Sequence, residues 1–443
     1  MLSHMDEAEL NMLLLRVRGL AVLRGVPASP AARDFLALLE LLSAEGPTPG
    51  TLVETFGRLW EELAAESGDL LPDAWRSHIV GRLLDDENPF SLAAERGELT
   101  SALVEQTLRD LRALRALFDL EAKTLIGLIE AAVPELKGAW VSWRDPEPGA
   151  GLSRRGEPRR VIARELAAAE DWGELVETLA EHHAAHGAGL FGRYRAFRWE
   201  GGDLRPVPRP DPVRLEGLIG YEKEREPLLE NTERLLAGLP AHHALLYGLP
   251  GTGKSSTVKA VLNEYADSGL KLVELAKEDL KELQPLLDAL RNRGPRFVLF
   301  IDDLSFEEHE VEYKSLKALL EGSIEEPPEN VRLYATSNRR NLIRERFSER
   351  DEADDVHWRD TMQEKLSLAA RFGLRITFPA PDQKRYLEIV SGLVRERGMK
   401  IPDSELRERA LLWDRWHVGR SGRTARQFVD ELEAELADAR QGL

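Results

Sequence analysis

The chain has 443 residues and a formal net charge of −18, with 42% of its residues hydrophobic and 31% charged. The apolar content excludes a disordered chain, and the length predicts two or three domains. The acidic balance disfavours a dedicated binder of nucleic acid or anionic membranes, and the absence of cysteine excludes disulfides and Cys-ligated zinc.

The N-terminal sequence, MLSHMDEAELNMLLLRVRGL, does not have the pattern of a secretion signal. It carries acidic residues where a signal peptide carries basic ones, and charges interrupt its apolar run. Elsewhere no stretch approaches the roughly 20 uncharged apolar residues that a membrane helix requires. We therefore expect a cytoplasmic protein with no membrane partner.

Residues 1–134 predict an α-helical N-terminal region. Leucine-rich segments such as 32–46 and 103–132 repeat apolar residues at helical spacing. The Gly- and Pro-rich stretch at 46–50 interrupts this pattern. Aromatic residues are only 7% of the chain, which also favours helices over sheets in this region.

Residues 135–212 predict a mixed connecting region and linker. Helical patterns at 161–169 and 172–186 are followed by a basic, aromatic and strand-like segment, GLFGRYRAFRW, at 189–199. Residues 201–212, GGDLRPVPRPDP, predict an extended linker, because proline sustains neither a helix nor a central strand.

From residue 213 onward the sequence alternates between strand and helix patterns. Apolar runs without alternation, such as VLFI at 298–301, are typical of strands buried on both faces. Such alternation predicts a parallel sheet with right-handed crossovers. The expected strands are 243–248, 270–276, 296–304, 331–338 and 374–378. We therefore predict an α/β nucleotide-binding core at 213–381 with a five-stranded parallel sheet, followed by a helical lid at 382–443.

Residues 248–255 read GLPGTGKS and match the phosphate-binding pattern G-x-x-x-x-G-K-[ST] in full. The motif follows an expected strand and precedes an expected helix, so backbone N–H groups and the helix dipole both favour an anion there. Lys254 can reach the β- and γ-phosphates of ATP, and the Ser255 hydroxyl can bind Mg²⁺. The expected phosphate-binding residues are Gly248, Leu249, Pro250, Gly251, Thr252, Gly253, Lys254, Ser255 and Ser256.

The second element of such a site is an apolar strand that ends in a carboxylate. It lies about fifty residues further on, where the apolar run FVLFI is followed by two aspartates. We expect Asp302 to hold the Mg²⁺ shell and Asp303 to orient or deprotonate the attacking water. An aspartate pair after a strand is often only a turn, but its pairing with the phosphate loop favours the functional interpretation.

With these residues in view, the C-terminal half resembles AAA+ ATPases, and more specifically a bacterial AAA+ family catalogued as a domain of unknown function. The resemblance runs from about residue 215 to the C-terminus. The resemblance is weak before about residue 189, so no residue role is inferred for that part of the chain. The matching stretches are LLYGLPGTGKSS, FIDDLSF, LYATSNRR, EKLSLAARFG and SGRTARQFVDEL.

The resemblance implies further roles within one subunit. Leu218, Ile219 and Gly220 are placed where AAA+ proteins pack the adenine ring. Asn338 resembles the sensor-1 residue that positions the lytic water, and its expected place at a strand end fits the ligand-binding edge of an α/β sheet. A turn-capping role for Asn338 is the alternative.

Arginines match the two remaining AAA+ positions. Arg371 resembles the arginine finger that acts on the γ-phosphate of a neighbouring subunit, a role suited to a guanidinium. Arg423 resembles the sensor-2 arginine of the lid, and Arg426, one turn further along, is the competing choice. The resemblance thus implies a homo-oligomer, with a ring of six subunits favoured.

The sequence departs from the family pattern in two places. Asp303 stands where glutamate is usual, so its arm is one methylene shorter and hydrolysis is expected to be slow or to need a partner. Residues 341–363 are a long charged insertion, which is either a client contact or a solvated loop.

Three functions stay open from the sequence. The leading hypothesis is a ring-forming ATPase that hydrolyses Mg-ATP to remodel an unknown protein or nucleoprotein client. A DNA or RNA loader is the second, because arginines and aromatic rings interleave in one segment. A slow, ATP-bound switch or scaffold is the third, because of Asp303. The interleaved residues are Arg193, Tyr194, Arg195, Phe197, Arg198 and Trp199.

Overall fold

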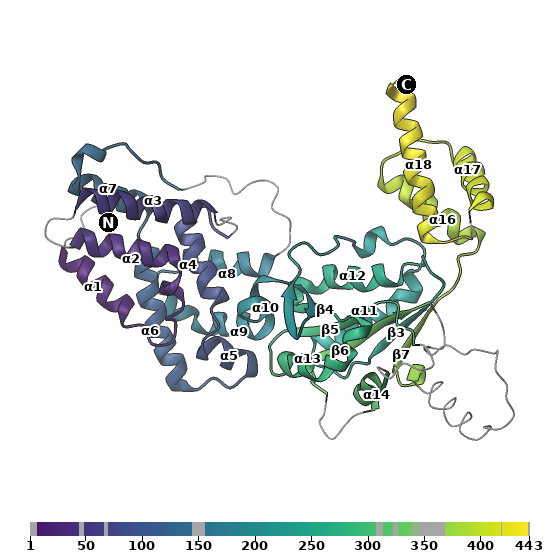
Figure 1. Cartoon of the computed structure of the whole chain (residues 1–443), viewed down its shortest axis with the longest axis horizontal. Helices are drawn as coiled ribbons and strands as arrows, with labels where there is room; N and C mark the ends of the chain where they lie inside the picture. Colours follow the sequence, from purple (N-terminus) through teal and green to yellow (C-terminus); the bar gives the residue numbers. More distant parts are fainter. Residues whose placement is uncertain are drawn as a thin grey trace. The chain divides into compact units, whose positions relative to one another are not determined.

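The computed structural model describes residues 7–43, 48–65, 70–143, 156–306, 313–321, 327–338, 342, 368–417 and 419–441 (Figure 1). The chain forms two compact units. A helical unit comprises Met1–Arg193 with Asn292–Pro295, and an α/β unit comprises Tyr194–Arg291 with Arg296–Leu443. The finer division predicted from sequence, at residues 134, 212 and 381, stays a prediction.

The helical unit confirms the α-helical character predicted for the N-terminal region. Short 3₁₀ helices, η1 (Val26–Ala28), η2 (Pro134–Leu136) and η3 (Trp172–Leu175), connect longer ones. The α-helices are α1 (Glu7–Arg18), α2 (Pro30–Ser43), α3 (Pro49–Ala65), α4 (Ala74–Asp85), α5 (Pro89–Arg96), α6 (Ser101–Phe118), α7 (Ala122–Ala132), α8 (Glu157–Ala168), α9 (Val176–His186) and α10 (Gly189–Arg193).

Side-chain caps begin several of these helices where the sequence offers a short polar residue. The Asp73 carboxylate accepts from the Arg76 N–H at 3.0 Å at the start of α4, and Asn88 and Ser91 form a reciprocal capping box on α5. In the core, the Phe35 ring stacks on Trp75 with centroids 3.8 Å apart. Side-chain caps therefore fix where these helices begin, and aromatic packing in the core holds them against one another.

A carboxylate buried in the helical unit holds the residues Asn292–Pro295 in place. The Glu95 side chain is 0% exposed and accepts from Arg293 Nε at 2.8 Å. It also accepts from the N–H groups of Ala188 and Gly294, each at 2.9 Å. Arg293 in turn lies over the Phe191 ring, 4.5 Å from its centroid. This carboxylate is thus paired and hydrogen-bonded, as a buried charge requires.

The α/β unit is built on one sheet of seven strands in the order β2-β1-β4-β5-β6-β3-β7. All pairings are parallel except β1 with β2. The phosphate loop follows β3, which lies between β6 and β7. The strands are β1 (Ala196–Glu200), β2 (Asp203–Pro206), β3 (Ala244–Gly248), β4 (Leu270–Glu274), β5 (Arg296–Ile301), β6 (Val331–Ser337) and β7 (Leu374–Phe378).

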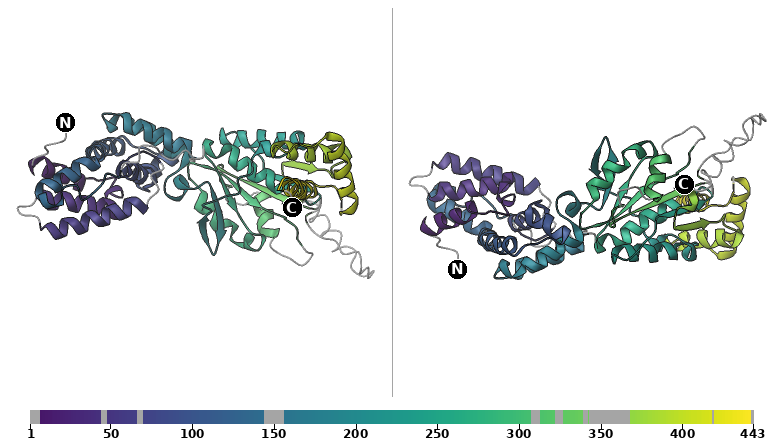
Figure 2. Two further views of the ribbon diagram at one scale, coloured as in Figure 1. Left: turned by 90° about the horizontal axis from the view of Figure 1, so that it is seen from above. Right: turned by 90° about the horizontal axis from the view of Figure 1, so that it is seen from below.

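Helices cover both faces of this sheet, with α11 and α12 on one face and α13 and α14 on the other (Figure 1). Three further helices form the C-terminal lid, drawn in yellow and yellow-green in Figures 1 and 2. The bounds are η4 (Leu215–Gly217), α11 (Glu222–Leu236), α12 (Lys254–Tyr265), η5 (Ala266–Ser268), η6 (Lys277–Glu282), α13 (Leu283–Leu290), α14 (Tyr313–Glu321), α16 (Gln383–Glu396), α17 (Asp403–Trp416) and α18 (Gly422–Gln441).

This architecture confirms the predicted α/β P-loop fold with a C-terminal helical lid, but the sheet has seven strands and the predicted number of five was wrong. Strand β1 adds to the edge of β4, with Phe197 opposite Val273, and β2 pairs antiparallel to β1. Strand β2 also lies within the predicted linker 201–212. It is an edge strand ending at Pro206, a place where proline is tolerated because no further strand requires its N–H.

Among the described residues, no helix combines the length and the apolar character needed to cross a membrane.

Candidate nucleotide-binding site

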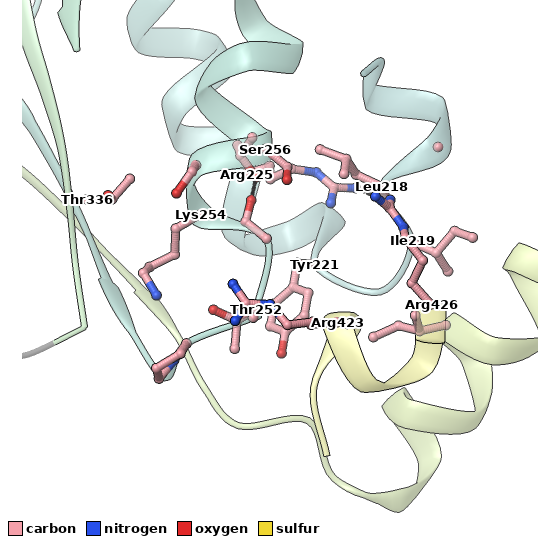
Figure 3. A pocket seen from close by; sticks show the side chains of 18 of the residues that line it. Leu218, Ile219, Tyr221, Arg225, Thr252, Lys254, Ser256, Thr336, Arg423 and Arg426 are labelled. Atoms are coloured by element: carbon pink, nitrogen blue, oxygen red, sulfur yellow. Dashed lines mark hydrogen bonds between the residues drawn. The ribbon is translucent and has the colours of Figure 1, made fainter. Parts of the chain in front are cut away.

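A pocket of about 560 Å³ opens in the α/β unit at the carboxyl ends of β3, β5 and β6, beside the N-terminus of lid helix α18 (Figure 3). Ligands bind at this edge in open α/β sheets. The structure brings together most of the predicted site residues. Those lining the pocket are Leu218, Ile219, Pro250, Gly251, Thr252, Gly253, Lys254, Ser255, Ser256, Asp302, Asp303, Asn338, Arg423 and Arg426.

The phosphate loop owes its shape to glycines with positive φ. These are Gly248 at 150°, Gly251 at 76° and Gly253 at 91°, values that L side chains rarely adopt. Helix α12 begins at Lys254, directly after Gly253. The first N–H groups of α12 have no partners within the helix, so this end of the pocket is suited to bind phosphate.

The Lys254 ammonium donates to three oxygens at once. Its Nζ lies 2.9 Å from Gly248 O, 2.9 Å from Leu249 O and 3.0 Å from Asn338 Oδ1. An ammonium has three hydrogens, so these partners use all of them. Burial lowers the pKa of Lys254, while Asp303 and Asp302 act to raise it. A phosphate oxygen arriving in the pocket would replace one of these acceptors.

The two acidic residues after β5 face the loop and β6 in different ways. Ser255 Oγ donates to Asp302 Oδ1 at 2.6 Å, which brings together the two predicted Mg²⁺ ligands. Asp303 Oδ1 accepts from Asn338 Nδ2 at 2.6 Å. Because Asn338 also accepts from Lys254, its amide links the phosphate loop to the second carboxylate.

Asp303 has a backbone φ of 51°, one of two positive values among the described non-glycine residues. Such a conformation is uncommon outside glycine and persists only where the surroundings hold it. Thr336 Oγ1 accepts from the Asp303 N–H at 2.9 Å and donates to Asp302 Oδ1 at 2.5 Å. Sequence analysis did not single out Thr336, although its position two residues before Asn338 in β6 was a signal.

The far end of the pocket is more apolar. Figure 3 shows Leu218 and Ile219 at this end and Lys254 at the other, and Ile389 and Leu393 of α16 also line the pocket. Gly220 lines a neighbouring groove instead, and its φ of 92° together with a close approach to Ile389 explains the glycine. An apolar end suits a planar base.

Tyr221 and Arg225 were missed by sequence reasoning and also line the pocket. Arg225 is buried and its guanidinium donates to the Leu218 carbonyl. Burial lowers the pKa of Arg225, whereas Glu222 and Glu224 raise it. Arg225 thus supports the loop that carries Leu218.

The lid touches the phosphate loop through the N-terminus of α18. The Arg423 N–H donates to Gly251 O at 3.3 Å, and a Cβ on Gly251 would lie 3.0 Å from Ser421 Oγ. In the view of Figure 3, the Arg423 side chain is drawn toward Thr252 and Arg426 toward Ile219. Both arginines line the pocket, so the choice between them as lid sensor stays a prediction.

Arg371 lies just before β7, is partly buried and does not line the pocket. Its predicted role concerns a neighbouring subunit, and this single chain does not test it. The predicted insertion 341–363 lies outside the described residues except for Leu342, whose carbonyl accepts from the Phe306 N–H at 2.6 Å.

Two of the three aromatic rings proposed to stack on nucleic acid are in the protein interior, and the third, Tyr194, is half-buried. Phe197 is 1% exposed and Trp199 4% exposed, and the Trp199 indole donates to Glu282 Oε2 at 2.8 Å. Arg198 pairs with Glu274 at 3.0 Å. These two rings therefore serve the sheet and are not available for base stacking.

Comparison with known proteins gives a family match and weaker likenesses. A family model described as "Protein of unknown function (DUF815)" matches residues 192–436. The replication factor C large subunit of Ignicoccus hospitalis is 38% identical over 72 residues, which are 16% of this chain and 14% of that protein. This chain therefore spans only a small part of that curated relative.

Among solved structures, the Thermotoga maritima RuvB Holliday junction branch migration motor has a TM-score of 0.37 and 20% sequence identity. The match covers 52% of this chain and 66% of that chain. A mutant of the same motor has a TM-score of 0.37 and 20% identity, with 52% of this chain and 67% of that chain covered.

Proposed function

This chain belongs to the DUF815 family of proteins of unknown function, and we propose that it is an AAA+ ATPase that binds ATP with Mg²⁺ and hydrolyses it. One observation carries the proposal. Lys254, Ser255, Asp302, Asp303 and Asn338 meet in one pocket, where hydrogen bonds link Lys254 through Asn338 to Asp303 and, separately, Ser255 to Asp302.

The residues fit Mg-ATP in their chemistry. Magnesium prefers hard oxygen ligands, and the Ser255 hydroxyl and the Asp302 carboxylate lie together at the phosphate end of the pocket. When bound, Mg²⁺ would neutralise charge on the phosphates. Lys254 would bind the β- and γ-phosphates, and the apolar end of the pocket at Leu218 and Ile219 would take the adenine.

The remaining polar groups are arranged for attack by water. Asp303 would orient or deprotonate the nucleophile, and Asn338 would hold Asp303 while sensing phosphate through Lys254. Arg423 or Arg426 would couple the lid to the nucleotide. These roles follow from position and residue chemistry.

We further propose that the chain works as a homo-oligomeric ring, six-membered by resemblance, that remodels a protein client. The support is Arg371, which is absent from the pocket of its own chain and matches the finger motif. A guanidinium supplied by a neighbour is worth a factor of about 10³–10⁵ in related phosphoryl transfers.

The test is ATP turnover per protomer against protein concentration, for the wild type and two disabled variants. Asp303→Asn removes the water-orienting carboxylate, and Arg371→Ala removes the finger. Each is expected to lose on the order of 100-fold or more in turnover. Chelation of Mg²⁺ with EDTA is expected to abolish wild-type turnover.

Mixing the two inactive variants then tests whether Arg371 acts on a neighbouring subunit or within its own chain. In a 1:1 mixture, about a quarter of sites combine an intact Asp303 with an intact Arg371 from the neighbour, if subunits contact head to tail. Turnover near that fraction supports the ring. Arg375→Ala, an exposed arginine on β7, is the matched control and should stay near wild type. A dead mixture contradicts the ring.

A slow nucleotide switch is the second candidate, and Asp303 favours it. Aspartate reaches less far than the usual glutamate, and its backbone φ of 51° must be held by neighbours. Tight ATP binding with turnover near zero at every protein concentration would support the switch and reject the ATPase proposal.

A further inference from the structure

Thr336 joins β6 to the first three residues that follow β5. Its side chain is 1% exposed. The hydroxyl donates to Asp302 Oδ1 at 2.5 Å and accepts from the Asp303 N–H at 2.9 Å. Its backbone carbonyl accepts from the Leu304 N–H at 2.7 Å. One residue thus contacts the Asp302 carboxylate, the backbone of Asp303 beside it and the segment that follows them at Leu304.

The directions of these hydrogen bonds follow from chemistry. An ionised carboxylate only accepts and a backbone N–H only donates, while a hydroxyl has one hydrogen and two lone pairs. The Thr336 hydroxyl can therefore satisfy Asp302 and Asp303 at the same time. An alanine or valine at 336 could satisfy neither.

The position of Asp303 depends on this arrangement. Its φ of 51° lies in the left-handed region, which aspartate tolerates better than most residues with a Cβ when local hydrogen bonds support it. Thr336 holds the Asp303 amide on one side. Asn338 Nδ2 holds its carboxylate on the other side, at 2.6 Å.

We propose that Thr336 is a positioning residue for the nucleotide site, which orients the Asp302 carboxylate toward the metal and holds Asp303 in its left-handed conformation. This inference rests on the proposed ATPase function. Thr336 lines the pocket, and it acts through the two aspartates because its hydroxyl already donates to Asp302 and accepts from the Asp303 N–H.

The competing explanation is that the hydroxyl merely satisfies buried polar groups. Loss of a structural hydrogen bond lowers stability but does not selectively change the metal dependence or kcat. Thr336→Val removes the hydroxyl at nearly constant shape, and Thr336→Ser keeps it. Thr232→Val is the matched control, because Thr232 is also buried in the α/β unit and its hydroxyl bonds Leu228 O and Tyr334, away from the pocket.

Steady-state ATP turnover is measured for the full chain over a range of ATP and Mg²⁺ concentrations. Thr336→Val is expected to lower kcat about 10-fold or more and to raise the half-saturating Mg²⁺ concentration, with KM for ATP changed by less than about 2-fold. Thr336→Ser should recover most of kcat, and Thr232→Val should match the wild type. A Thr336→Val enzyme with wild-type kcat and Mg²⁺ dependence would overturn the inference, as would equal damage from Thr336→Ser.

ATP binding with Mg²⁺ and with EDTA keeps this inference separable from the hydrolysis proposal. If the wild type does not turn over, hydrolysis fails, but the ratio of the two affinities still reports on Asp302. The ratio is the affinity for ATP with Mg²⁺ divided by the affinity for ATP with EDTA. A smaller ratio in Thr336→Val than in Thr336→Ser supports the positioning role, and equal ratios reject it. Should Thr336→Val not fold, Thr336→Ala against Thr336→Ser gives the same comparison.

Discussion

Gly248→Ala is expected to destabilise the α/β unit far more than Gly253→Ala, although both glycines have positive φ in one loop. A Cβ on Gly248 would lie 2.0 Å from the Phe378 carbonyl oxygen. Phe378 is the residue opposite Gly248 in the pairing of β3 with β7. Around Gly253, no heavy atom of the described chain lies within 4 Å of the added Cβ.

The two substitutions therefore differ in mechanism and in magnitude. Gly253→Ala carries backbone strain of about 1–2 kcal/mol, partly offset by about 0.4–1 kcal/mol from a less flexible unfolded chain. Gly248→Ala adds a backbone clash that no rotamer relieves. Overpacking of about 1–3 kcal/mol and a lost strand hydrogen bond of about 1 kcal/mol, added to the same strain and the same unfolded-chain offset, bring its total to about 2–6 kcal/mol.

Hydrogen exchange on peptides covering β3 and β7 is the suitable assay, because a chain of two units need not unfold in one step. Gly248→Ala should remove most protection there, while Gly253→Ala should leave it nearly intact. Since Gly253 lines the pocket, Gly253→Ala should still weaken ATP binding. Equal loss of protection in both variants would refute the clash argument.

Three other predictions concern buried charged and titratable groups. Glu95→Gln breaks the buried pair with Arg293 and should cost the helical unit about 3–5 kcal/mol in urea unfolding, whereas Glu98→Gln, at an exposed pair, should cost under about 1 kcal/mol. Burial lowers the pKa of His183 to about 4, so below pH 6.5 the unfolded state binds more protons than the folded state. The free energy of unfolding should therefore fall by about 2 kcal/mol from pH 7 to pH 5. The variant His183→Leu should remove this part of the pH dependence. Lys254→Met should lower ATP affinity by about 10- to 100-fold in calorimetry, and an unchanged affinity would contradict the predicted phosphate contact.

Part of the sheet was missed because its pairing is not local. The sequence of 189–199 predicts a strand, but it does not predict which other strand this one pairs with. Phe197 pairs with Val273, 76 residues further on. This contact forms because β1 hydrogen-bonds the edge of β4 that β5 does not occupy. Proline in 201–212 predicted a linker, yet Pro206 ends an edge strand where its missing N–H is harmless.

Within the site, the sequence by itself determined the phosphate loop and the paired aspartates. Glycines before Lys254 specify a turn that only they adopt readily, and an apolar run before Asp302 specifies a buried strand. These signals are local, so strand, turn and helix follow from neighbouring residues. The tertiary structure alone decided which side chains meet. Strand β6 lies between β3 and β5, and this order brings Asn338 to Lys254 and Thr336 to Asp302, because parallel strands end at a common edge.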